Sequence, residues 1–299
     1  LNDNFRRFRR VEIESGATLI LDGTFGHNLG TVVGEGTIKL VNTTSLPAGD
    51  YDDYFPDASC SSGGGLAYEN TNTTSPMTIL SSISNIRRVI VSGDGEKILP
   101  TGSNINICEN LEIEDDGEFS MNDNTTLNVK EDIIKASTAS FDADFNNATV
   151  ILDGTSQQTI DGSFTGTDAM PTLELDNAAG LTILNTNDDD VEVRDELIFT
   201  DGLIETDADN SLIIGQSADI SGFNSSRYVD GPLVRTLGAT TTSNFDAFPV
   251  GDNGRYGILE ISNISITSPD DWEVEYFDND PENVVSGSDP TFLSTAATS

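Results

Sequence analysis

The sequence has few of the side chains from which most catalytic and metal centres are built. Its 299 residues include one histidine, His27, and two cysteines. No G-x-S-x-G, H-E-x-x-H, C-x-x-C or glycine-rich phosphate-loop motif occurs. His27 lies in the segment GHNLG, and we expect it to be a solvent-exposed turn residue. These absences argue against nucleophilic hydrolases, zinc enzymes and sites that bind nucleotide phosphates.

Basic residues are scarce as well. Lys plus Arg number 14 and Asp plus Glu number 51, which gives a formal net charge of −37. Such a surface repels phosphate backbones and anionic lipid headgroups, so we expect no nucleic-acid partner. Solubility and calcium binding both explain this acidity, and the two interpretations stay open.

Long apolar runs are missing too. No stretch of about 18 apolar residues is present, and the first residues, LNDNFRRFRR, lack the apolar core of a signal peptide. We therefore expect a soluble, processed or excised segment with no direct membrane insertion. Cys60 and Cys108 are compatible either with one disulfide or with two free thiols.

What the sequence does contain is a repeat of short apolar–polar–apolar triplets, separated by Asn, Asp, Gly, Ser and Thr. Three series of triplets recur at intervals of about 23 residues. The first series starts at Ile105, Leu127, Val150, Leu173, Leu197 and Ile220. The second starts at Val89, Leu111, Ile133, Thr159, Leu181, Leu203 and Tyr228. The third starts at Lys97, Phe119, Phe141, Val191 and Leu212.

Three series with a common interval predict an all-β fold: a right-handed parallel β-helix with three strands and about 23 residues per coil. A triplet buries only two side chains, so it becomes stable only when coils stack about 4.8 Å apart. An antiparallel sandwich is the alternative. No window keeps a helical apolar stripe.

The alternation of side chains along a strand predicts which residues share the core. We expect Asn128 and Glu174 to face solvent. One apolar column should contain Leu127, Val129, Val150, Leu152, Leu173, Leu175, Leu197 and Phe199.

The same patterns predict three regions. Residues 1–10 form a basic N-terminal segment, and residues 11–240 form the parallel β-helix, with an irregular insertion at about 42–76. Longer alternating runs, YGILEIS and WEVEYF, predict a small antiparallel β unit in residues 241–299.

Several phrases resemble the secreted, repeat-rich surface proteins of Bacteroidota that are substrates of type IX secretion. They are VEIESGATLIL, GEGTIKL, VILDGTSQQTIDG, LTILNT, VEVRDELIFTDGLIETDADNSLIIG, RYVDGPLVRTLG, FPVGD and SPDDWEVEYFDNDP. The resemblance covers about residues 11–285 and names no activity. It implies an extracellular or cell-surface location and an adhesin or stalk, in which residues 241–299 are the truncated start of a further domain.

Calcium is the metal that the acidic turns would take, because it prefers several oxygen ligands. In FDADFNNATVILD, the residues Asp142, Asp144, Asn146 and Asp153 occupy positions 1, 3, 5 and 12 of a loop similar to an EF-hand, but Asn147 replaces the glycine at position 6. A second candidate is the run Asp188, Asp189 and Asp190. Solvated turn carboxylates are the alternative for both.

The N-terminal FRRFRR clusters four of the basic residues: Arg6, Arg7, Arg9 and Arg10. A basic arm on an acidic body predicts docking on a second copy of the chain. A disordered leader is the alternative.

We therefore expect a non-catalytic structural protein, a rigid stalk or adhesin that contacts glycans or host or environmental surfaces. One alternative is a filament-forming subunit. The other is a carbohydrate-binding or carbohydrate-active β-helix protein, since some lyases of this fold work from a basic residue in a groove. Lys130 and Lys135 are candidates to flank such a groove, but charge balance on an acidic surface explains both.

Overall fold

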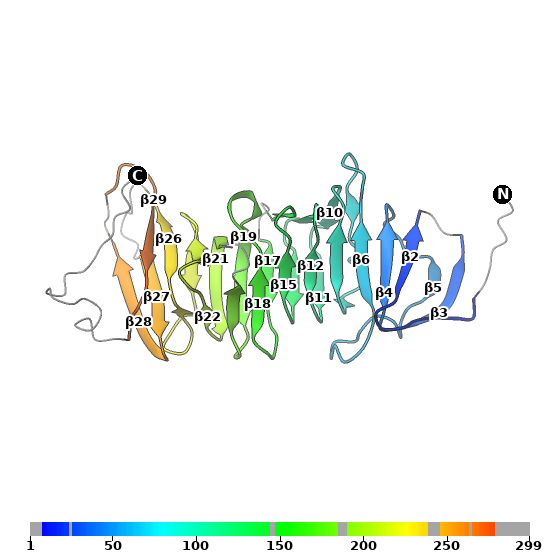
Figure 1. The fold of residues 1–299 in the computed structure, drawn as a ribbon, viewed down its shortest axis with the longest axis horizontal. Helices are drawn as coiled ribbons and strands as arrows, with labels where there is room; N and C mark the ends of the chain where they lie inside the picture. Colours follow the sequence, from blue (N-terminus) through cyan, green and yellow to red (C-terminus); the bar gives the residue numbers. More distant parts are fainter. Residues whose placement is uncertain are drawn as a thin grey trace.

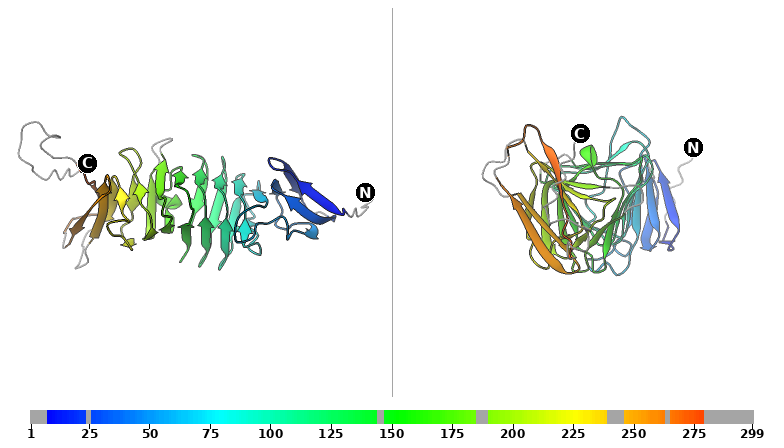
Figure 2. Two further views of the ribbon diagram at one scale, coloured as in Figure 1. Left: turned by 90° about the horizontal axis from the view of Figure 1, so that it is seen from below. Right: turned by 60° about the vertical axis from the view of Figure 1, so that its left-hand side comes forward.

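The computed structural model describes residues 8–23, 26–143, 147–184, 190–238, 246–262 and 265–278. It confirms the predicted fold class: the chain is a parallel β-solenoid of about ten turns, with about 22 residues per coil. The coils stack into an elongated body, with the N-terminal strands at one end and the C-terminal strands at the other (Figure 1). The two further views show sheets surrounding a central core (Figure 2).

Four sheets make up the solenoid. The twelve-stranded sheet runs in the order β2 (Thr18–Asp22), β4 (Thr37–Val41), β6 (Gly65–Glu69), β9 (Val89–Ser92), β12 (Leu111–Ile113), β15 (Ile133–Lys135), β18 (Gln158–Asp161), β20 (Leu181–Leu184), β22 (Ile204–Glu205), β25 (Val229–Asp230), β27 (Asp246–Asp252) and β28 (Arg255–Ile261). The ten-stranded sheet has the order β8 (Asn85–Ile86), β11 (Asn104–Ile107), β14 (Thr126–Val129), β17 (Thr149–Leu152), β19 (Met170–Asp176), β21 (Val191–Asp201), β23 (Leu212–Ile214), β26 (Leu233–Leu237) and β29 (Asp270–Val274), and β24 (Asp219–Ser221) also pairs with β21.

The two smaller sheets complete the coils. The four-stranded sheet has the order β7 (Met77–Thr78), β10 (Glu96–Leu99), β13 (Glu118–Met121) and β16 (Ser140–Asp142). The three-stranded sheet contains β1 (Arg10–Ile13), β3 (Asn28–Gly34) and β5 (Ala48–Asp50). A single 3-10 turn, η1, covers Gly166–Asp168.

The predicted apolar column is confirmed. All eight of its residues are at most 2% exposed. The register aligns Leu127 with Val150, Leu173 and Leu197, and the same strands align Val129 with Leu152, Leu175 and Phe199. Asn128 and Glu174 are half-buried on the opposite face of their strands. The core is therefore a set of in-register apolar rows that continue from coil to coil.

The third predicted series of strands forms a separate sheet only in its first members, which lie in β10, β13 and β16. Its members at Val191 and Leu212 lie in β21 and β23 of the ten-stranded sheet. The reason is local: the stretch VEVRDELIF has no glycine, proline or asparagine at which to end the strand, so β21 continues for 11 residues, with register shifts against β19, and contains members of two predicted series. The apolar row itself continues through Phe164, whose ring lies 5.4 Å from that of Phe141.

The first coils have a different construction. Strands β1 to β6 alternate between the three-stranded and the twelve-stranded sheets, which gives two strands per coil. The predicted irregular insertion at 42–76 contains two strands: β5, which pairs with β3, and β6, which pairs with β4 and β9. The irregular part before β6 is anchored by buried Tyr54 and by a disulfide between Cys60 and Cys108. The disulfide settles the alternatives that the cysteine count leaves open.

The C-terminal strands continue the solenoid before they reverse direction. β27 pairs with β25 in parallel, and the turn at Asn253 and Gly254, both with positive φ, then leads into antiparallel β28. β29 pairs antiparallel with β26 and not with β28. The antiparallel strands expected in 241–299 are therefore present, but each extends a different sheet of the solenoid.

Three basic side chains on strands β10, β15 and β26 are buried. Lys97 is fully buried, and its ammonium donates hydrogen bonds to the carbonyls of Gly93 and Gly95. Buried Lys135 forms an ion pair of 3.0 Å with Asp168, which rules out the role of flanking an outer groove. Arg235 donates to the carbonyl of Ala218 at 2.9 Å.

We predict that Leu175→Asp lowers the free energy of unfolding by about 3 to 5 kcal/mol, because it places an unpaired carboxylate inside the column. Asn128→Asp is the matched control, since it adds the same group on the outer face and should change stability by less than about 1 kcal/mol. Urea denaturation measures both. Equal losses for the two variants would contradict the assignment of faces.

Lys97 makes stability depend on pH. Burial lowers the pKa of Lys97 to about 8 in the folded chain, whereas its ordinary value is 10.5. Between pH 8 and pH 10.5, Lys97 is therefore protonated to a greater extent in the unfolded chain than in the folded chain. Stability from this group therefore rises as pH increases. We expect the stability of the native chain relative to Lys97→Met to increase by about 1 to 3 kcal/mol between about pH 7.5 and 10. Denaturation curves at the two pH values test this, and a constant difference would contradict it.

Candidate functional site

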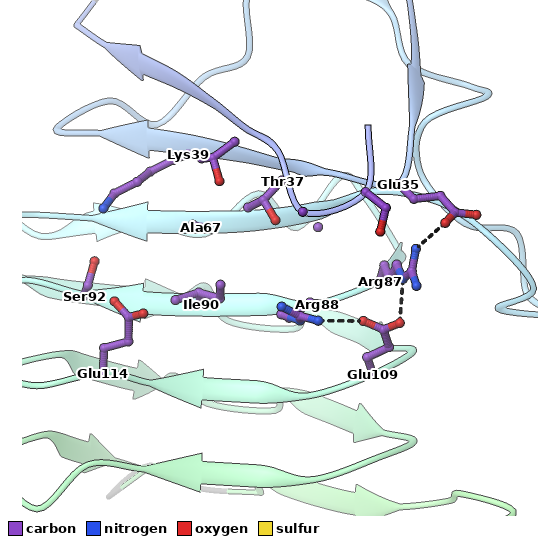
Figure 3. Close-up of a pocket in the computed structure, with 14 residues that line it drawn as sticks. Glu35, Thr37, Lys39, Ala67, Arg87, Arg88, Ile90, Ser92, Glu109 and Glu114 are labelled. Carbon is purple, nitrogen blue, oxygen red and sulfur yellow. Dashed lines mark hydrogen bonds and ion pairs between the residues drawn. The ribbon is translucent and has the colours of Figure 1, made fainter. Parts of the chain in front are cut away.

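A cleft of about 410 Å³ lies on the outer face of the twelve-stranded sheet, near the N-terminal end of the stack (Figure 3). Its floor is formed by Gly65 and Ala67 of β6. In the neighbouring strands, Lys39 and Ile90 occupy the positions in register with Ala67. The cleft thus arises because β6 carries small residues between two strands with long side chains.

An ionic cluster closes one end of the cleft. The Arg87 Nε donates to a Glu109 carboxylate oxygen at 2.6 Å, and its Nη1 lies 3.2 Å from Glu35 (Figure 3). Arg88 contacts the other oxygen of Glu109 at 3.3 Å. The hydrogen bond with Glu109 raises the pKa of Arg87. Arg87 also contacts the Gly63 carbonyl at 3.4 Å, so one guanidinium connects its own coil with three others.

The other end of the cleft holds Ser92, Glu114 and Lys39, and Lys39 forms an ion pair with Glu69. Within the described structure, the Ser92 hydroxyl and the Arg88 Nε have no hydrogen-bond partner. Three basic residues and three glutamates line the cleft, so its formal charge is balanced in a molecule that is otherwise strongly acidic. Such a lining presents both donors and acceptors to a polar ligand.

Two further clefts flank the insertion. One, of about 520 Å³, lies beside the disulfide and contains Glu131 and the pair formed by Lys130 and Asp153, whose charged atoms are 2.7 Å apart. Burial is the main cause that raises the pKa of Glu131. The other, of about 510 Å³, is lined by Tyr51, Phe55, aliphatic residues and several polar residues, among them Asp52.

The structure does not bring together the described members of the first calcium candidate. Asp142 lies in β16, while Asp153 follows β17 and pairs with Lys130. Asp144 and Asn146 fall outside the described residues. No group of three or more His, Cys, Asp or Glu in the described ranges is placed to hold a metal ion.

In the second calcium candidate, the carboxylate of Asp190 accepts a hydrogen bond from the Ser211 backbone N–H at 2.8 Å. Asp188 and Asp189 lie outside the described part of the chain. Both calcium sites remain predictions.

Of the four arginines of the basic arm, Arg9 and Arg10 lie within the described residues. Arg10 pairs with Glu12 at 2.5 Å on the exposed face of β1, and the Arg9 carbonyl accepts a hydrogen bond from Thr31. Arg6 and Arg7 precede the described residues. The docking role of the arm remains a prediction.

Sequence reasoning missed the ionic cluster of the cleft, although a signal for it exists. Arg87 and Glu109 are separated by one coil, and so are Lys130 and Asp153. In a solenoid, residues one period apart become neighbours on adjacent strands. Opposite charges at the repeat interval therefore predict ion pairs between coils.

We predict a coupling energy of about 1 kcal/mol between Arg87 and Glu109 in a double-mutant cycle of Arg87→Met and Glu109→Gln. The pair of Arg87 and Glu109 is only partly exposed, whereas the control pair of Arg10 and Glu12 is exposed. Added salt should therefore reduce the coupling energy of Arg87 and Glu109 less than that of the control pair. Thermal unfolding at low and high salt measures both cycles. A coupling for Arg87 and Glu109 no larger than that of the control would show that the cluster does not stabilise the stack.

No protein-family model, no curated protein and no solved structure matches the chain. Among the described residues, none of the helical segments is long and apolar enough to cross a membrane. The fold and the cleft therefore provide the basis for a functional proposal.

Proposed function

We propose that the chain is an extracellular structural and adhesive segment of a cell-surface protein, a rigid stalk that holds a binding surface at a distance. One observation carries this proposal: the twelve-stranded sheet continues from β2 to β28, one end of the described structure to the other. In the described residues, every strand of this sheet is hydrogen-bonded to the next one in the order.

The pattern of hydrogen bonds explains why such a body is stiff. From β9 onward, each inner coil is bonded to its neighbours on more than one face, whereas the first coils join the rest of the stack through the pairing of β6 with β9. Bending the rod would lengthen several backbone hydrogen bonds at once and separate the apolar rows behind them. Stiffness is therefore distributed along the stack.

Two properties support an extracellular location. The disulfide between Cys60 and Cys108 ties the insertion to a coil corner, and such bonds persist in oxidising compartments. The net charge of −37 keeps an elongated molecule soluble and separate from its copies.

Filament formation is a second candidate, and the ends of the rod favour it. Strands β2 and β28 each have a single pairing partner in the described structure. Both expose large apolar side chains: Ile20 is 59% exposed, and Ile258 and Leu259 are 44% and 40% exposed. Unpaired strand edges of this kind pair with other strands. Growth of the particle with concentration in light scattering would favour the filament over the stalk.

The stalk proposal is tested by the distance between its ends. Spin labels at Ile20→Cys and Glu260→Cys sit on the outer β2 and β28, which the stack places about 50 Å apart. The native disulfide stays intact if labelling is done without reductant. We expect one narrow distance distribution that does not change between low and high salt.

The control pair is Ile20→Cys with Ile134→Cys on β15, which should report about 24 Å. A narrow distribution for this pair together with a broad one for the end-to-end pair would locate a hinge in the C-terminal half. That result would contradict a rigid stalk.

A further inference from the structure

The cleft on the twelve-stranded sheet is an open trough that follows β6. Its floor is Gly65 and Ala67, and its walls are the outward side chains of β4 and β9 (Figure 3). The backbones of β4 and β9 lie two strand spacings apart, about 10 Å, and the small residues Gly65 and Ala67 leave the floor between them open as far as Glu69, which pairs with Lys39. This shape suits a segment of an extended polymer.

The trough also contains a polar group that the fold does not use. Ser92 is 9% exposed, and its hydroxyl lacks a hydrogen-bond partner within the described structure. The buried Arg88 Nε has no hydrogen bond either, although it lies 3.6 Å from a Glu112 carboxylate oxygen. A buried polar group without a partner has a free-energy cost, which a ligand with complementary hydroxyl groups would remove.

We propose that this trough binds a neutral saccharide chain. Glu114 offers an exposed carboxylate that accepts hydrogen bonds from hydroxyls, while Arg88 and Ser92 offer donors to hydroxyl oxygens. Ile90 and Ala67 provide apolar surface for the C–H face of a sugar ring. The balance of three basic residues and three glutamates favours a ligand without net charge.

Other polymers fit less well. Nucleic acids and polyuronates are repelled by the large negative charge of the whole molecule. A peptide that added itself as a strand would need unpaired backbone groups, but β6 is already paired along both edges. A saccharide needs only side-chain contacts, which the trough supplies.

This inference names the ligand of the adhesive part of the proposed function and rests on that part alone. The spacer role is independent of it, because stiffness comes from the stack and not from the trough. Loss of saccharide binding with a narrow end-to-end distance would therefore reject the ligand and leave the stalk in place.

The test is affinity electrophoresis of the whole chain through gels that contain one polysaccharide each. Neutral probes are mixed-linkage β-glucan, xylan and mannan, and anionic comparators are polygalacturonate and alginate. We expect at least one neutral probe to retard the native chain. We expect Ala67→Gln, which fills the trough, to weaken that retardation at least tenfold. Ile134→Gln, at an outward position of the same sheet beyond the trough, should bind like the native chain.

Ser92→Ala provides a second variant that keeps the fold. Its hydroxyl is buried without a partner in the described structure, so its removal should keep or raise the melting temperature while it weakens retardation several-fold. Retardation only by anionic probes, or by none, overturns the proposal. So does retardation by a neutral probe that Ala67→Gln leaves unchanged while its melting temperature stays native.

Discussion

The whole structure depends on the stacking of coils in register. A strand of three or four residues buries only two side chains, which cannot offset the entropy of ordering its backbone. When coils stack, each inward residue meets its equivalent above and below, and the backbone groups of neighbouring strands satisfy one another. Leu127, Val150, Leu173 and Leu197 show this directly, because they form one continuous row. Stability is therefore a property of neighbouring coils rather than of any single strand.

Several of the few basic residues stabilise the stack. Lys97 and Arg235 are buried and donate to backbone carbonyls. Arg87 connects its own coil with three others, and Lys130 pairs with an acid one coil away. Other basic residues pair at the exposed surface, where the carboxylates dominate because acidic residues outnumber basic ones by 51 to 14. The cleft at Arg87 and Arg88 combines the two roles, since its ionic cluster also shapes a surface depression.

Much of the fold was predictable because its signal repeats. An interval that recurs over many coils identifies the strands, and alternation within each triplet identifies the buried face, as for Leu175 and Glu174. Structural features that occur in only one coil leave no repeating signal in the sequence, so they were not predictable. The merging of two predicted strands into β21 depends on the absence of glycine, proline and asparagine within one segment, and β6 is hidden in a stretch rich in glycine and serine. The trough was missed because it depends on small residues at Gly65 and Ala67 relative to their neighbours on adjacent strands, and the register of those strands is known only from the structure.

The register between coils also makes the length of the molecule adjustable. Residues 111–132 span the interval between the equivalent positions Leu111 and Ile133, so their removal would bring β9 against β15 with inward and outward faces still matched. Each such step would shorten the rod by about 4.8 Å without changing its cross-section. A lineage that duplicates or loses whole coils could thus tune how far a surface is held from its anchor, while a change of one or two residues would disturb the register and be removed by selection.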